Sequence, residues 1–185
     1  MHFERFQGLL KAYNIPLHEW GVGEAKTIEH LFAEISSGEV TLIPNPDNTT
    51  LICAIEVAAL NVYYEEDATR LMLVEKMQTF SDSRCHTRAL EASIGEKIMP
   101  GDTPEIACYH AFFEKLGING FEENLHFVQR PVIIRGPNPS FSFPGMLTRY
   151  TIHMFEVVLP SPLYRKEGYK KCQGDKTSYF IWRKC

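Results

Sequence analysis

Residues 95–118, which read GEKIMPGDTPEIACYHAFFEKLGI, bring together acidic, basic and imidazole side chains. Asp102 and Glu105 stand three residues apart, and His110 and Glu114 follow four residues apart. Residues four apart on a helix are neighbours, so His110 and Glu114 are expected to lie side by side. Carboxylates of this kind can hold a divalent cation, and a helix entered through a glycine-containing loop can face a phosphate. The segment therefore has the layout of a metal and phosphate site.

A loop, one helix and a terminating glycine must position these side chains. The helix is predicted over residues 104–116, because Asp102 and Glu105 have capping-box spacing and Pro104 suits a first turn. Gly117 follows the last apolar position and is expected to end the helix. The face predicted to pack on the core, from its position on a helical wheel, consists of Ile106, Tyr109, Phe113 and Leu116, with Phe112 at its margin.

The segment resembles the Nudix box, G-x5-E-x7-R-E-U-x-E-E-x-G-U, where U is aliphatic. In that family the glutamates of the box hold Mg²⁺ or Mn²⁺ against a substrate diphosphate. Two stretches, EKIMPGD at 96–102 and FPGMLTRYTIH at 143–153, are also similar to a divergent Nudix-like group of eukaryotic proteins. The resemblance covers residues 28–184 and implies an α/β fold, with a Nudix-like mixed β-sheet sandwiched by helices.

The box is degenerate at its paired glutamates. With Gly117 and Ile118 as the closing G-U, Glu114 takes the position of the first paired glutamate. Lys115 takes the second. A lysine brings a fixed positive charge beside Glu114, which lowers the local demand for a cation. A lysine can instead meet a phosphate directly as a point charge.

Other positions of the box also depart from the family pattern. Ala111 stands where the glutamate of the Arg-Glu pair is expected, and His110 stands where its arginine is expected. Asp102 falls on the isolated upstream glutamate, and Glu96 falls on the opening glycine. The resemblance therefore leaves Glu114 and Asp102 as metal ligands if the protein is active, with Glu114 as its catalytic residue. Lys115, His110 and Arg149 are the predicted phosphate- or ligand-binding residues.

Three functions are consistent with these residues. The first is a binding module for a nucleotide or a protein partner, with weak or no hydrolase activity, in effect a pseudoenzyme. The second is an active metal-dependent hydrolase of a diphosphate-linked substrate, with the cation held by Glu114, Asp102 and either Glu96 or Glu105. The third is an RNA-associated module, because residues 164–184 interleave lysines and arginines with tyrosines and a tryptophan.

The rest of the chain divides into a helical extension over residues 1–48 and a Nudix-like domain over 49–185. Apolar residues at helical spacing predict helices over 3–13 and 28–35, the second capped by Thr27. Predicted strands, from apolar runs and alternation, cover residues 51–64, 70–80, 84–90, 126–135, 148–159 and 177–184. Residues 136–145, rich in proline and glycine, and the charged residues 164–176 are predicted loops.

Composition sets limits on the class of protein. The net charge is −4 and the pI about 6.0, which argues against a wholly basic nucleic-acid binder. The five cysteines show no C-x-x-C spacing and are expected to be free thiols in a reducing compartment. The N-terminus lacks the apolar run of a signal peptide, and no segment approaches a membrane span. We therefore expect a soluble, cytoplasmic protein with no membrane partner.

Overall fold

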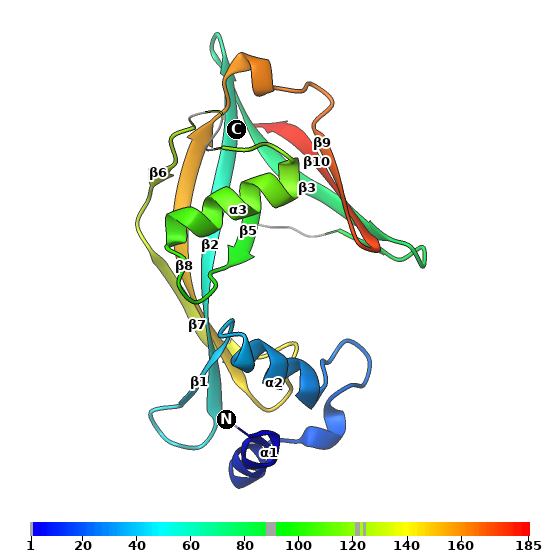
Figure 1. The fold of residues 1–185 in the computed structure, drawn as a ribbon, viewed down its shortest axis with the longest axis vertical. Coiled ribbons are helices and arrows are strands. Elements are labelled where there is room, and N and C mark those ends of the chain that lie inside the picture. The colour runs from blue at the N-terminus through cyan, green and yellow to red at the C-terminus, as the bar shows by residue number, and fades with distance from the viewer. Residues whose placement is uncertain (1, 88–91, 121–122, 124) are drawn as a thin grey trace. The chain divides into compact units, whose positions relative to one another are not determined.

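The structure, a computed structural model, describes residues 2–87, 92–120, 123 and 125–185. Within these residues the chain forms three α-helices and a mixed sheet, so the expected α/β class is confirmed (Figure 1). The helices are α1 (Phe3–Ala12), α2 (Ile28–Ser36) and α3 (Pro104–Leu116). The strands are β1 (Thr41–Pro44), β2 (Leu51–Glu66), β3 (Thr69–Phe80), β4 (Cys85–His86), β5 (Ile94–Lys97), β6 (Val128–Gln129), β7 (Ile133–Pro139), β8 (Leu147–Val158), β9 (Tyr169–Gln173) and β10 (Lys176–Lys184). No helix in these ranges is long and apolar enough to cross a membrane.

The chain forms two compact units that are discontinuous in sequence. Unit 1 comprises residues 1–57, 97–101 and 132–152, and unit 2 comprises 58–96, 102–131 and 153–185. This division differs from the boundary between residues 48 and 49 expected from the sequence. The N-terminal helices pack with the start of β2 and the loop before β8, so they share a core with chain that is distant in sequence. Where a functional domain begins remains a prediction.

Unit 1 is held together by an apolar cluster under its two helices. Phe6 and Leu10 of α1 and Leu31 of α2 have no exposed surface, and they pack with Leu51 and Cys53 of β2. The helix α2 begins where predicted, since the Thr27 hydroxyl accepts a hydrogen bond from the backbone N–H of His30. Burial of this apolar cluster stabilises the two N-terminal helices against the start of β2.

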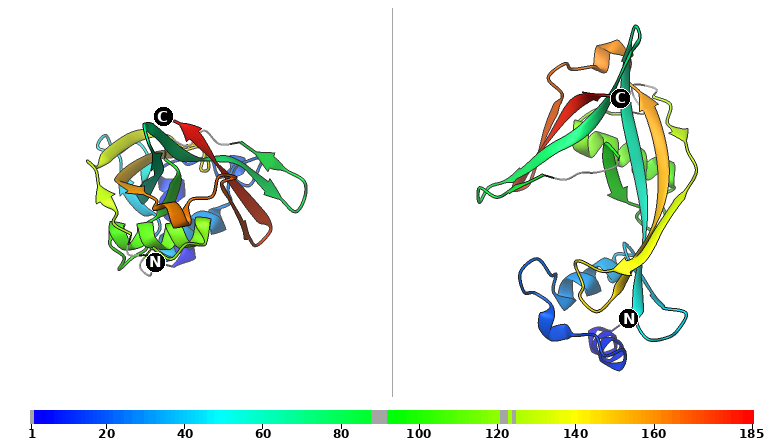
Figure 2. Two further views of the ribbon diagram at one scale, coloured as in Figure 1. Left: turned by 90° about the horizontal axis from the view of Figure 1, so that it is seen from above. Right: turned by 180° about the vertical axis from the view of Figure 1, so that it is seen from behind.

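The strands pair in the order β6-β8-β2-β3-β10-β9, with β4 pairing to β3 and β5 to β2. Unit 2 holds these strands except the starts of β2 and β8 and the last residue of β5, which belong to unit 1. The pairs β2–β3, β3–β10 and β10–β9 are antiparallel, whereas β2 and β8 run in the same direction in Figure 1. Figures 1 and 2 show α3 lying across one face of these strands. The buried residues of unit 2 include Leu73 of β3, Phe112 of α3 and Phe180 of β10.

Most predicted elements are confirmed to within two residues, and three are corrected. The predicted strand over 126–135 is interrupted: it forms β6 and β7, with Pro131, which lacks an N–H for the ladder, between them. The Gly-Pro-Asn-Pro segment predicted as loop continues β7 through a register shift. The charged segment predicted as loop contains β9, because Tyr169 is buried and the strand pairs with β10. For the predicted strand over 84–90, β4 pairs with β3, and residues 88–90 lie outside the described residues.

Candidate functional site

The box segment folds as predicted in outline, with β5, a loop, α3 and a glycine stop. Its N-cap is Thr103, whose hydroxyl accepts a hydrogen bond from the backbone N–H of Ile106 at 3.2 Å. The predicted capping box of Asp102 and Glu105 is therefore wrong by one residue, while Pro104 does occupy the first turn. Gly117 adopts a left-handed conformation with φ 71° and donates its N–H to the carbonyl of Phe113. Asp102 is thereby free of a capping role.

The buried face of α3 is confirmed at Phe112 and Leu116 and differs from the prediction elsewhere. Its members, each buried, are Ala107, Cys108, Ala111, Phe112 and Leu116. Ile106 and Phe113 are 36% and 53% exposed instead. Small side chains let the helix approach the sheet closely, whereas the helical wheel gave the larger apolar residues more weight. As a result Ala111, which replaces a box glutamate, is a packing residue that is 1% exposed.

An ion pair joins the two ends of the box. The Lys115 ammonium lies 3.0 Å from the Glu96 carboxylate, with the side chains 18% and 36% exposed. Lys115 comes from the last turn of α3, and Glu96 comes from β5. A lysine at this position neutralises directly an acid that could otherwise have faced a cation. The predicted phosphate-binding lysine therefore has a carboxylate partner.

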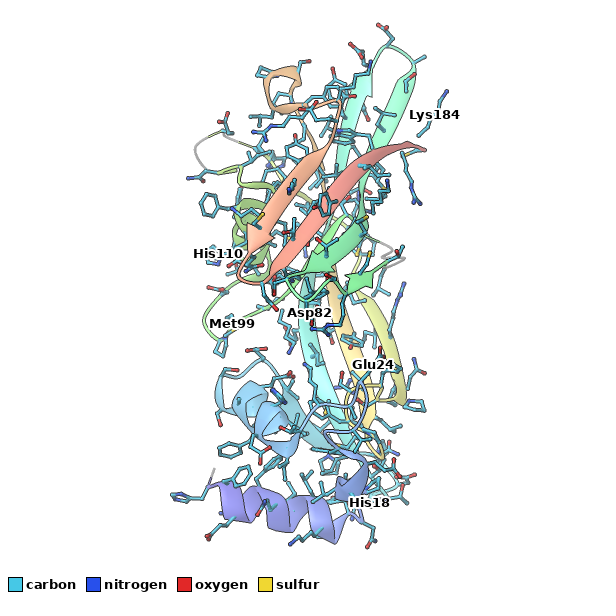
Figure 3. The ribbon with its side chains drawn as sticks, turned by 90° about the vertical axis from the view of Figure 1, so that its right-hand side faces the viewer. His18, Glu24, Asp82, Met99, His110 and Lys184 are labelled. Carbon is cyan, nitrogen blue, oxygen red and sulfur yellow. The ribbon has the colours of Figure 1, made fainter. Side chains whose placement is uncertain are left out.

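A second pair lies at the start of the helix. His110 Nδ1 is 3.5 Å from the Asp102 carboxylate, and the imidazole is more than half exposed (Figure 3). The side chain of Glu114, one turn further along α3, is exposed. Sequence spacing predicted that His110 and Glu114 are neighbours, but His110 contacts Asp102 of the preceding loop. The site residues of unit 2 are thus divided between two separate acid–base pairs and one exposed acid.

The residues present do not fit the Mg²⁺ or Mn²⁺ site that the resemblance implies. Within the described ranges, no group of three or more His, Cys, Asp or Glu residues converges well enough to hold a metal ion. Mg²⁺ requires near-octahedral oxygen ligands and is usually held through carboxylates. Asp102 and Glu96 face basic side chains, and Ala111 supplies no ligand.

Arg149, the third predicted ligand-binding residue, lies on β8 in unit 1. It is half-buried opposite the register shift of β7, where a side chain at Gly136 would come within 3.4 Å of the Arg149 Cα. Asp102, His110 and Lys115 belong to unit 2. The structure therefore assigns Arg149 and the box residues to different compact units.

The cysteine of α3 is a core residue. Burial and, to a lesser extent, the nearby Glu105 carboxylate together raise the pKa of the Cys108 thiol to about 12. A thiol with this pKa is protonated at neutral pH and is a poor nucleophile. Cys108 therefore contributes packing to unit 2.

The aromatic side chains near the C-terminus contact one another. Tyr164 stacks on Tyr64 with ring centroids 3.7 Å apart, and the Trp182 indole N–H donates to the Arg165 carbonyl at 2.7 Å. Tyr169 is buried. Binding of single-stranded RNA uses aromatic faces on which bases can stack. In the described structure these rings have packing partners within the protein.

Sequence reasoning missed a buried polar pair on β3. The Gln78 amide donates to the Glu75 carboxylate at 2.7 Å, and both side chains are less than 9% exposed. Residues three apart on a regular strand point to opposite faces. Here β3 contains a bulge, because Tyr179 of β10 pairs with Met77 while its neighbour pairs with Glu75. The bulge brings Glu75 and Gln78 to one face, and no local sequence pattern marks it.

Comparison with known proteins gives structural neighbours only. No protein-family model matches the chain, and no curated protein matches it. The chain is similar to the E. coli dihydroneopterin triphosphate pyrophosphohydrolase, with 17% identity, a TM-score of 0.39, and coverage of 57% of this chain and 68% of that one. It is also similar to a mutT/nudix family protein from Listeria innocua, with 12% identity, a TM-score of 0.40, and coverage of 58% and 66%. The C. elegans Ap4A hydrolase matches with 11% identity, a TM-score of 0.41, and coverage of 71% and 80%. At these values the likeness assigns no activity and no site residue to this chain.

Proposed function

We propose that this protein is a binding module on a Nudix-like α/β fold, with weak or no metal-dependent hydrolysis of diphosphates. The observation that carries the proposal is the ion pair between Lys115 and Glu96 at 3.0 Å. Diphosphate cleavage of this type depends on a cation that offsets charge and positions a water. An ammonium group at the position of a metal-ligating carboxylate offsets negative charge permanently. It cannot, however, coordinate and activate a water molecule as a metal cation does.

The buried Ala111 supports the same proposal. Its methyl group lies in the interface between α3 and the sheet and is 1% exposed. A carboxylate there would have to be desolvated, which is costly unless the charge is paired. A carboxylate at this position would disturb the packing of α3, so a single Ala111→Glu substitution is not expected to create a working metal ligand.

The proposed ligand is a nucleotide or another small molecule that carries a phosphate group, bound without metal. The candidate phosphate-binding side chains in unit 2 are Lys115 and His110, and each has an acid beside it, Glu96 and Asp102 respectively. A ligand phosphate would replace these acids as the partner. Binding is then expected to be stronger when the competing acid is neutralised.

The test is calorimetric titration of the full chain with ADP and ADP-ribose, in EDTA and in MgCl₂. We expect saturable binding in EDTA that weakens in Lys115→Met and strengthens in Glu96→Gln. The control is Lys184→Gln, which removes an exposed lysine at the end of β10. Binding that requires MgCl₂, followed by turnover that Glu114→Gln abolishes, would show instead that the protein is the metal-dependent hydrolase.

The same titration separates the remaining alternatives. If neither nucleotide binds and a defined protein partner does, the protein-binding alternative is favoured. For RNA, a filter-binding assay across salt is the corresponding measurement, because a phosphate-contacting binder loses affinity steeply as salt rises.

A further inference from the structure

Unit 1 contains a cavity that the box residues do not explain. It measures about 280 Å³. One wall is formed by β2, through Cys53, Ile55 and Val57, which alternate along the strand and so share one face. The remaining lining residues are Lys26, Glu34, Lys97, Asn138, Pro139, Ser140, Phe141, Ser142, Phe143, Thr148 and Tyr150. A volume of this size is near the lower end for ligand pockets, which suits one small ring system.

The loop that closes the cavity is held in place from several sides. Within the loop, the Ser140 N–H donates to the Met146 carbonyl at 2.9 Å, and the Ser140 hydroxyl accepts from the Phe143 N–H at 3.2 Å. From outside the loop, the Lys26 N–H donates to the Ser142 carbonyl at 2.8 Å, and the Trp20 indole N–H donates to the loop at 2.9 Å. A loop pinned in this way presents its side chains in a fixed geometry, which lowers the entropy cost of binding.

On this pinned loop, Phe141 is 78% exposed. Exposure of one large apolar side chain is ordinary in itself, but this one lines a cavity. Tyr150 of β8 lines the same cavity and is 40% exposed. Aromatic rings at a cavity edge are suited to contact with a planar ligand.

The cavity has a charged end. Lys26 Nζ lies 2.5 Å from one carboxylate oxygen of Glu34, and Lys97 Nζ lies 3.0 Å from the other. Lys97 Nζ also lies 2.8 Å from Glu39, which is not part of the lining. Burial alone would raise the pKa of Glu34, but hydrogen bonds from the two lysines outweigh it and lower the pKa. The Glu34 carboxylate is therefore ionised at neutral pH and paired with the ammonium groups of Lys26 and Lys97.

The two lysines keep donors for a ligand. Each ammonium group has three N–H donors, of which Lys97 directs two to carboxylates and Lys26 directs one to Glu34. Both oxygens of Glu34 already accept, so this acid offers little to a ligand cation. An acidic group on a ligand is the complement of the remaining lysine donors.

We propose that the unit 1 cavity binds a small planar aromatic molecule that carries one acidic group. The ring lies against the apolar face of β2 and beside Phe141. The acidic group receives hydrogen bonds from Lys97 and Lys26. This site is independent of the box residues, because its lining belongs to unit 1 and the box acids and bases belong to unit 2.

The experiment is calorimetric titration of the full chain with 2-naphthoate as the probe, beside 2-naphthamide, which has the same rings without the charge. Saturable binding of 2-naphthoate is expected, with binding of 2-naphthamide weaker by about tenfold or more, the scale of losing one charge-assisted contact. Phe141→Ala and Val57→Trp are both expected to weaken binding of 2-naphthoate, the first by removing ring contact and the second by filling the cavity. Phe113→Ala, at an exposed phenylalanine of unit 2, is the matched control and is expected to leave the affinity unchanged.

Three results of these titrations would overturn the proposal, and a fourth would come from inorganic phosphate. They are the absence of saturable 2-naphthoate binding up to its solubility, equal affinity for the amide, and unchanged affinity in both Phe141→Ala and Val57→Trp. Phe141→Ala removes an exposed side chain and is expected to fold, so the test does not depend on the larger tryptophan being accommodated. Inorganic phosphate serves as an anion without a ring, and binding as tight as that of 2-naphthoate would also contradict the proposed ring contact.

Discussion

Reversal of charge at Lys115 tests the role assigned to the ion pair with Glu96. At 3.0 Å the gross attraction is about 5 kcal/mol with an effective dielectric constant of about 20. The two side chains are 18% and 36% exposed, so solvent screening reduces the net contribution to about 1 kcal/mol. Lys115→Met is expected to lower the free energy of unfolding by about that amount. Lys115→Glu adds a like-charge repulsion of similar size, and the loss is expected to reach about 2–3 kcal/mol.

The second part of this prediction concerns metal. Lys115→Glu places a new carboxylate beside Glu96, so MgCl₂ is expected to recover about 1 kcal/mol of the lost stability. The wild type and Lys115→Met are expected to show no such recovery. The assay is urea denaturation of the three proteins with and without MgCl₂, at constant ionic strength. Equal stability of Lys115→Glu and the wild type, or an equal response of both to MgCl₂, would refute the assigned role.

Three further predictions concern other parts of the fold. Gly168→Ala is expected to cost several kcal/mol in urea denaturation, because its Cβ would meet a backbone oxygen of β10 at 1.9 Å, whereas Gly174→Ala, with open space, is expected to cost about 1 kcal/mol. Similar losses in the two variants would contradict the packing of β9 on β10. Thr103→Ala is expected to lower the free energy of unfolding by about 1 kcal/mol through loss of the N-cap, and Asp102→Ala is expected to lower it by less. A larger loss in Asp102→Ala than in Thr103→Ala would contradict the observed cap. The pKa of Glu34 is lowered in the folded state, so the stability that its ionised form contributes is present above pH 4.5 and is lost as the pH falls. In Glu34→Gln the free energy of unfolding is expected to depend less steeply on pH in the acid range, and an unchanged pH dependence would contradict this.

The extent to which the fold could be predicted depended on how local each signal is. The helix α2 could be predicted because Thr27 caps it and its apolar stripe is regular. The strand β9 could not, because its charged sequence follows no apolar pattern and its pairing with β10 decides its structure. The grouping of the N-terminal helices with residues 132–152 is likewise a property of tertiary packing.

The candidate site shows the same limit. Spacing and the resemblance to the Nudix box identified Asp102, His110, Glu114 and Lys115 as the residues to examine, and the helix that carries the last three lies where expected. It could not reveal that Lys115 reaches Glu96, because that contact depends on how α3 packs against β5. Ala107 and Ala111 were missed on the buried face of α3 because close helix–sheet packing favours small residues, which count little on a hydrophobic wheel.

The central proposal is that the Lys115–Glu96 ion pair stands where the resemblance to the Nudix box would place a metal ion. The most direct measurement is calorimetric titration of the wild-type full chain with Mn²⁺, beside Glu114→Gln. Our account predicts no saturable site at millimolar Mn²⁺ in either protein. A stoichiometric site in the wild type that disappears in Glu114→Gln would contradict it and would establish the box as a working metal centre.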